Sequence, residues 1–378
     1  MYYIIENRFG FSTFPYIETH NKKGDMKMVL YLILFIILIM TMYCVRINTG
    51  NFTAALSYDK SNAMKGILAL VIVFHHLVLE SNTSFIGLEV FKYIAFPLVS
   101  VFFFFSGYGL VKSYYKNGGQ IFLKQYAIKR MTRLLIPYII VIIYYGLYKY
   151  FREPAAFNLG NFLADVFLAR EIGPLWYMTV ILFVYALFGV CFKYLKAVTA
   201  RRAILAATVV YIFSCIAFSA PSQWYSSIIG FYVGILYGMN EKKVTDSIHD
   251  RYFVKLFLLF FGFVILFGLR LVVSSRITDS EILHGPFRSA IDIVFILFLI
   301  SLFEIIEIKK NAMLFIGKIS YEIYLIHPFI IYSLAKKILD DEKYSLIAFL
   351  CSILLAYILN VINVRLSKNI INHFNRVE

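Results

Sequence analysis

The sequence predicts an all-α fold, a polytopic transmembrane helical bundle. Of its 378 residues, 61% are hydrophobic and only 16% are charged. Its apolar runs repeat at lengths near 20 residues, which is the length a helix needs to cross a ~30 Å hydrocarbon core. These runs are continuous and show no alternation of polar and apolar residues, so they favour helices over a closed barrel. We expect about ten core spans and one extra N-terminal span.

The N-terminal part of the chain precedes this core. Residues 1–27 are polar and irregular, and the pattern assigns no fold to them. Residues 28–46 form an apolar run that no small-residue cleavage site follows, so we expect a membrane anchor, not a signal peptide. Residues 61–366 make up the core domain, and 367–378 a cytoplasmic tail.

The core spans follow one another without an appended soluble domain or an internal repeat. They are expected near 62–80, 88–111, 134–151, 175–192, 203–220, 223–239, 253–273, 288–306, 314–335 and 345–366.

The positive charges give the orientation of the bundle. A net charge of +15 is compatible with nucleic-acid binding, but the basic residues sit in short loops between spans, which is the orientation signal of membrane proteins. The densest loop is expected to be cytoplasmic and contains Lys112, Lys116, Lys124, Lys129, Arg130 and Arg133. The partner is therefore the lipid bilayer, and no nucleic acid is expected. The four cysteines lie in apolar runs without metal-ligand spacing, so no metal site is predicted.

The span 62–80 carries ionisable residues inside an apolar helix, which marks a functional site. Lys65 and His76 are eleven residues apart, so they lie roughly 20° apart in azimuth and roughly 16 Å apart along the axis. Glu80 follows one turn later on the same face, whereas His75 points roughly 80° away. The helix thus aligns a cation near one membrane face with a histidine near the bilayer centre.

Four stretches in order carry a family resemblance. Lys65 and His76 enclose GILALVIVFH, and they are followed by FFFFSGYGL at 102–110, IKRMTRLLIPY at 128–138 and ISYEIYLIHP at 319–328. Together they resemble the membrane acyltransferase-3 family, over roughly residues 61–366. Such proteins move acyl groups, usually acetyl from acetyl-CoA, onto sugars or other extracytoplasmic acceptors. One departure is Lys65, where many relatives carry arginine; the charge is kept and the bidentate fork is lost.

The resemblance and the helix geometry imply roles on the first core helix. His76 is the candidate general base for an acceptor hydroxyl, because imidazole titrates near neutral pH. The alternative, a histidine that hydrogen-bonds between helices, is disfavoured by the alignment with Lys65 and by the other three stretches. Glu80 either orients the His76 imidazole or is an interfacial acid at the helix end, and both interpretations stand. His75 is expected to be a packing residue.

The basic stretch is interpreted as the donor site. Arg130 and Arg133 share one helix face, and guanidinium forks suit the phosphates of coenzyme A. The alternative is cytoplasmic anchoring or contact with anionic lipid. With Lys65 they are predicted to receive acyl-CoA, most simply acetyl-CoA, as a co-substrate; no bound cofactor is expected.

Further residues are candidates for a substrate cavity. His327 lies nine residues past Lys318, roughly 13 Å into the bilayer, close to the depth of His76. Tyr324 and Tyr321 precede His327 on nearly the same face. The alternative for these three residues is an aromatic contact between helices.

Other polar and aromatic residues in the spans are given simpler roles. Ser106 either faces the cavity or permits close helix packing, the second being the simpler interpretation. Trp176 and Tyr177 are expected in an aromatic belt, and Asp292 is expected to pair with Arg288 one turn before it.

The resemblance therefore implies a membrane-embedded O-acyltransferase, and the span pattern places it in a membrane, expected to be the bacterial cytoplasmic membrane. It would move an acyl group, most simply acetyl, from cytoplasmic acyl-CoA to a hydroxyl of an extracytoplasmic or lipid-linked carbohydrate. Two alternatives are a multi-span carrier or exporter of a glycolipid or small solute, with histidines that relay protons, and a catalytically silent assembly partner. The acceptor, the acyl chain, an acyl-enzyme intermediate and the oligomeric state are left open.

Overall fold

The computed structural model describes residues 26–50, 52–81, 87–152, 154, 157–167, 175–276, 281–341 and 343–377. The expected all-α polytopic bundle is confirmed. The elements are α2 (Met26–Cys44), β1 (Val45–Ile47), α3 (Tyr58–Glu80), η2 (Glu89–Lys92), α4 (Ala95–Lys116), α5 (Gln120–Arg152), α6 (Leu159–Val166), α7 (Trp176–Tyr194), α8 (Ala197–Ala217), α9 (Gln223–Ser226), α10 (Ile229–His249), α11 (Tyr252–Arg276), α12 (Glu281–Glu304), β2 (Ile306–Ile308), α13 (Ala312–Lys318), α14 (Ser320–Asp340) and α15 (Lys343–Val377).

The described residues contain eight helices long and apolar enough to cross a membrane, or nine if one bent pair is a single span. The sequence predicts about eleven spans, so the described residues contain fewer than expected. The apolar part of α2, Met28–Cys44, is shorter than the other spans. Helix α10 is not among the candidates because it carries charges in its second half and leaves helical geometry at Asn240. Residues 1–25, most of the expected polar segment, lie outside the described residues, and α15 continues as a helix into the expected tail.

Three boundaries near the candidate site differ from the expectation. The run expected at 88–111 begins with the short helix η2, and α4 starts only at Ala95. The run expected at 314–335 is two helices, α13 and α14, bent by 74°. Helix α3 begins at Tyr58, so Lys65 lies two turns inside the helix and deeper than its place in an expected 62–80 span.

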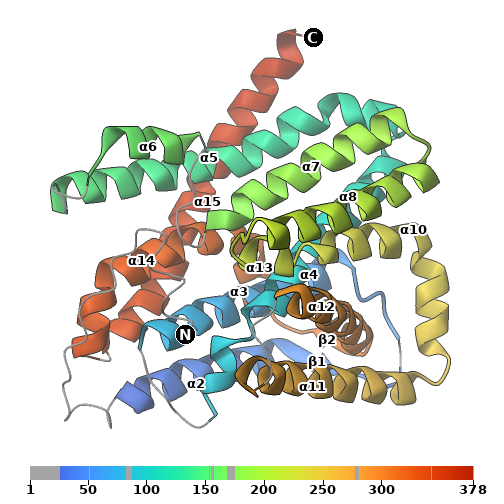
Figure 1. The fold of residues 1–378 in the computed structure, drawn as a ribbon, viewed down its shortest axis with the longest axis horizontal. Coiled ribbons are helices and arrows are strands. Elements are labelled where there is room, and N and C mark those ends of the chain that lie inside the picture. The colour runs from blue at the N-terminus through green and yellow to red at the C-terminus, as the bar shows by residue number, and fades with distance from the viewer. Residues whose placement is uncertain are drawn as a thin grey trace.

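Helix α3 runs through the middle of the bundle, with α2 on one side and α13 and α14 on another (Figure 1). Its contact with α13 is made between backbones. A Cβ on Gly66 would overlap the carbonyl oxygen of Met313, and a Cβ on Gly317 would overlap that of Asn62. Small residues allow such close approach, which is a main source of helix association in membranes.

A two-stranded ribbon and one lysine fix the N-terminal end of α3. β1 pairs antiparallel with β2, Arg46 opposite Glu307, and so joins the end of α2 to the connection after α12. The apolar pattern of the sequence did not predict these strands. The ammonium of Lys60 in the first turn of α3 is buried and donates to the backbone carbonyls of Phe303 and Glu304. The start of α3 is thereby tied to the end of α12.

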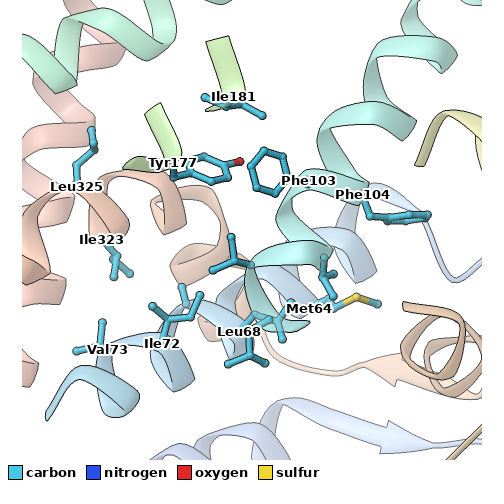
Figure 2. Close-up of a cluster of buried hydrophobic side chains, with 14 of the residues drawn as sticks. Met64, Leu68, Ile72, Val73, Phe103, Phe104, Tyr177, Ile181, Ile323 and Leu325 are labelled. Carbon is cyan, nitrogen blue, oxygen red and sulfur yellow. The ribbon is translucent and has the colours of Figure 1, made fainter. Parts of the chain in front are cut away.

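Helices α4 and α10 pack through a regular stripe of glycines. Gly230, Gly234 and Gly238 recur every four residues on one face of α10, which is a pattern typical of close helix pairs. A Cβ on Gly234 would overlap the carbonyl oxygen of Phe104 on α4. Phe104 in turn belongs to the buried cluster that α3, α4, α7 and α14 share (Figure 2).

We therefore expect Gly234→Ala to destabilise the protein by about 1–3 kcal/mol, because the added methyl group forces the α4 and α10 backbones apart. Thermal unfolding of the purified protein in a fixed detergent measures this. Gly109→Ala on α4 is the matched control, since nothing lies within 4 Å of its added Cβ. Equal melting temperatures for the two variants would show that the glycine stripe does not set the packing of α4 on α10.

Candidate active site

Two histidines from different helices meet inside the bundle. His76 on α3 and His327 on α14 have ring centroids 5.0 Å apart. His327 has 0% of its surface exposed, whereas His76 is half-buried. The Nδ1 of His327 lies 2.7 Å from the carbonyl oxygen of Ile323, which only accepts, so Nδ1 carries the proton. Its Nε2 is then unprotonated and can accept a hydrogen bond. Within the described residues this atom is buried without a hydrogen-bond partner.

His75 faces a different neighbour. Its Nδ1 hydrogen-bonds the backbone carbonyl of Phe91 in η2, and its ring meets His76 edge-on at 4.8 Å. This carbonyl bond occupies one nitrogen and fixes the ring against η2. The contacts of His75 are thus those of a packing residue behind His76.

Tyrosines extend from the histidine pair towards α7 and α4. The ring of Tyr324 lies 6.3 Å from that of His327 and 5.1 Å from that of Tyr177 on α7. The phenol of Tyr177 lies beside the hydroxyl of Ser106 on α4. Ser106 and Tyr324, both predicted from sequence as cavity residues, are therefore linked through Tyr177.

Tyr177 was assigned to an aromatic belt at the membrane surface, and its position corrects this. It is buried, and it points towards Phe103 in the centre of the bundle (Figure 2). The signal was its helical phase: Ile181 and Val184, one and two turns further along α7, are buried on the same side. The belt was predicted because Tyr177 stands at the start of a span, where interfacial aromatic residues are expected. The side of the helix on which it lies, which points to burial, was not considered.

Tyr321 connects the histidine helix to the basic stretch. Its hydroxyl donates to the carbonyl of Leu134 on α5 at 2.8 Å and lies 2.8 Å from the sulfur of Met178 on α7. Leu134 follows Arg133 directly. Tyr321 therefore holds α14, α5 and α7 together at the turn where α5 leaves its basic segment.

The basic residues predicted to receive the donor are brought together in part. The ammonium of Lys65 lies 5.0 Å above the ring of Phe105, and Arg130 is close enough for the two positive charges to act on each other. Two cations held together in this way favour an anion between them. Arg133 lies one turn further along α5 with an exposed side chain, and its backbone carbonyl accepts a 3.4 Å bond from Asn363.

Glu80 is the last residue of α3, one turn past His76, and is partly buried. Its role of orienting the imidazole stays a prediction, as do the catalytic and binding roles of the other site residues.

A bundle of apolar helices long enough to span a bilayer, with two histidines facing each other in its interior and Lys65 on the same central helix as His76, defines an integral multi-pass membrane protein with a candidate site inside it. Comparison with family models identifies which. Residues 58–364 match the model described as an acyltransferase domain of the acyltransferase-3 family. The chain therefore belongs to the acyltransferase-3 family and is a membrane acyltransferase. Neither the curated proteins nor the solved structures contain a match to it.

We expect Tyr321→Phe to destabilise the protein by about 1 kcal/mol, because the Leu134 carbonyl loses its hydroxyl donor at a partly buried site. Thermal unfolding measures the effect. Tyr357→Phe, at an exposed position of α15, is the control and should leave the melting temperature unchanged. Identical melting curves for both variants would mean that the Tyr321 hydroxyl does not hold α14 to α5.

Proposed function

We propose that the protein transfers an acyl group, most simply acetyl, from cytoplasmic acyl-CoA to a hydroxyl of an extracytoplasmic or lipid-linked carbohydrate. The observation that best supports this proposal is the arrangement of residues along α3. Lys65 and His76 lie on one uninterrupted helix, roughly 16 Å apart along its axis. Arg130 from α5 lies near Lys65, and His327 from α14 lies against His76. The multi-pass body accords with a place in the bacterial cytoplasmic membrane.

The cation pair suits the coenzyme phosphates. Phosphates do not enter hydrocarbon, so they stop where Lys65 and Arg130 meet them. An extended pantetheine arm is on the order of the same ~16 Å rise, so the thioester would reach the histidines. Arg133, exposed one turn away, would add a contact to the outer phosphates.

The histidines suit the chemistry of the acceptor. His76 takes the proton of the acceptor hydroxyl as its oxygen attacks the thioester carbonyl. The tetrahedral intermediate collapses, the carbon–sulfur bond breaks, and the imidazolium returns the proton to the coenzyme A thiolate. The unprotonated Nε2 of His327 would accept a hydrogen bond from a second hydroxyl of the same acceptor and help to position it. Glu80 would stabilise the His76 imidazolium.

The first test concerns His76. We expect His76→Ala to lower transfer by at least about a hundredfold, the usual contribution of a general base, with the protein still folded. Mass spectrometry of surface glycans and release of coenzyme A thiol both measure it. The matched control is His75→Ala, which removes the neighbouring ring held by Phe91 and should retain more activity. A dead His75 variant beside an active His76 variant would reverse the assignment, and full activity in both would favour the assembly-partner alternative.

The second test concerns the donor site and separates an enzyme from a carrier. Lys65→Gln and Arg130→Gln should each raise the Kd of acetyl-CoA about tenfold or more, since a charge-assisted bond is worth ~1.5–3 kcal/mol. Calorimetric titration of the purified protein measures it. Lys112→Gln is the control, because Lys112 pairs with Glu241 at 2.8 Å at the exposed end of α4. A carrier would show no acetyl-CoA binding and would tolerate Arg130→Lys.

A further inference from the structure

A second buried polar cluster lies apart from the histidines, where α4, α9, α11 and α12 meet. On α12, Arg288 donates to both oxygens of Glu281 at 2.8 and 3.0 Å. The hydroxyl of Tyr225 on α9 donates to the same carboxylate at 2.7 Å. From α11, the guanidinium of Arg270 stacks over the ring of Phe96 at 4.9 Å.

This arrangement corrects the pairing expected from sequence. Arg288 and Asp292 are four residues apart, and a pair between them was predicted. Arg288 instead binds Glu281 through two hydrogen bonds, a geometry that fixes its guanidinium. Asp292 is left one turn deeper, with the charges of Arg288 and Arg270 nearby.

Asp292 is the unusual member of the cluster. It has 0% of its surface exposed, and among the described residues neither carboxylate oxygen has a hydrogen-bond partner. The hydroxyl of Ser100 on α4, which lies beside it, is equally buried and also unpartnered within the described residues. Buried polar atoms without partners cost free energy and call for an explanation, such as a catalytic role or a bound water, ion or other molecule.

The charges indicate what kind of group would bind. The cluster holds two guanidiniums, of Arg270 and Arg288, and two carboxyl groups, of Glu281 and Asp292, so neither kind of ionisable group outnumbers the other. A carboxylate accepts hydrogen bonds from hydroxyl groups, and a serine hydroxyl both donates and accepts. The unpartnered atoms therefore match a neutral group rich in hydroxyls.

The position of the cluster fits an acceptor. Glu281, with 38% of its side chain exposed, is at the surface end of α12, and the chain of contacts leads inward through Arg288 to Asp292. With the basic loop in the cytoplasm, this end of α12 faces outwards. The segment 89–100 also joins the two sites: Phe91 contacts His75, and Phe96 and Ser100 border the cluster.

We propose that Asp292 and Ser100 form a binding subsite for a neutral, hydroxyl-rich carbohydrate, the acceptor side of the transfer reaction. The inference rests on the proposed function for its role in catalysis, but the binding itself is separable. Asp292 and Ser100 hold the sugar, Arg270 and Arg288 flank Asp292, and His76 acts on a hydroxyl of the portion that reaches α3.

The test is a binding titration that needs no turnover. Trp176→Phe leaves Trp224, the residue before Tyr225, as the one tryptophan of the chain, and its fluorescence reports on the cluster. In nanodiscs prepared without glycoside detergents, methyl glucoside and N-acetylglucosamine should give saturable changes, and glucuronate and glucosamine weaker ones. Asp292→Asn should raise the Kd of the neutral sugars about tenfold or more, and Ser100→Ala about threefold.

The Ser100→Ala variant shows whether weaker sugar binding comes from loss of the subsite or from misfolding. Its hydroxyl has no protein partner among the described residues, so the variant should keep its melting temperature while binding sugar less tightly. The matched control is Ser345→Ala on α15, another fully buried serine whose hydroxyl is without a described partner, and it should change neither.

Sugar affinities that are equal in the parent, Asp292→Asn and Ser100→Ala proteins overturn the proposal, as does a parent protein that binds no neutral sugar. Acetyl-CoA titration of the same samples separates the two ideas. Loss of sugar binding with unchanged acetyl-CoA affinity supports the subsite, whereas absent acetyl-CoA binding refutes the proposed function and leaves the sugar result to stand by itself.

Discussion

The close contact of α3 with the bent pair α13–α14 is the constraint on which the rest of the site depends. Gly66 and Gly317 let the two backbones touch, and a methyl group on either glycine would overlap a carbonyl of the other helix. Lipid tails are as apolar as side chains, so such packing is what holds helices together in a membrane. The 74° bend between α13 and α14 then turns α14 across α3, and His327 comes to lie on His76.

The same helix carries two lysines whose surroundings give them different tasks. Lys60 is buried, and its ammonium is used by Thr53 and by two carbonyls at the end of α12. Lys65, five residues on, has an aromatic ring beneath it and another cation nearby. An ammonium whose hydrogen bonds are all made within the protein anchors the helix. Two neighbouring cations are instead stabilised by an anion that binds between them. Contact partners, more than residue type or depth, distinguish the structural lysine from the candidate donor-binding one.

Much of the fold followed from the sequence because length and apolarity fix spanning helices. Along α3, regular helix geometry also predicted how Lys65 and His76 align. The sequence did not predict contacts set by tertiary packing: the break after Lys318, the β1–β2 ribbon and the inward position of Tyr177. It also misjudged Asp292, because i to i+4 spacing permits a pair with Arg288 but does not show that Glu281 already occupies that guanidinium. Local periodicity carries no information on such competition between partners.

Buried polar groups in this bundle fall into two kinds, and the difference bears on function. The carboxylate of Glu322 on α14 is buried and accepts from Asn360 and Asn363 at 3.0 and 2.8 Å, and the same Asn363 reaches the backbone of Arg133. A network satisfied in this way joins α5, α14 and α15 and needs no ligand. The Nε2 of His327 and the carboxylate of Asp292 are equally enclosed but lack described partners. An unmet buried acceptor is destabilising, and these two acceptors lie where the proposed reaction needs hydroxyl groups held.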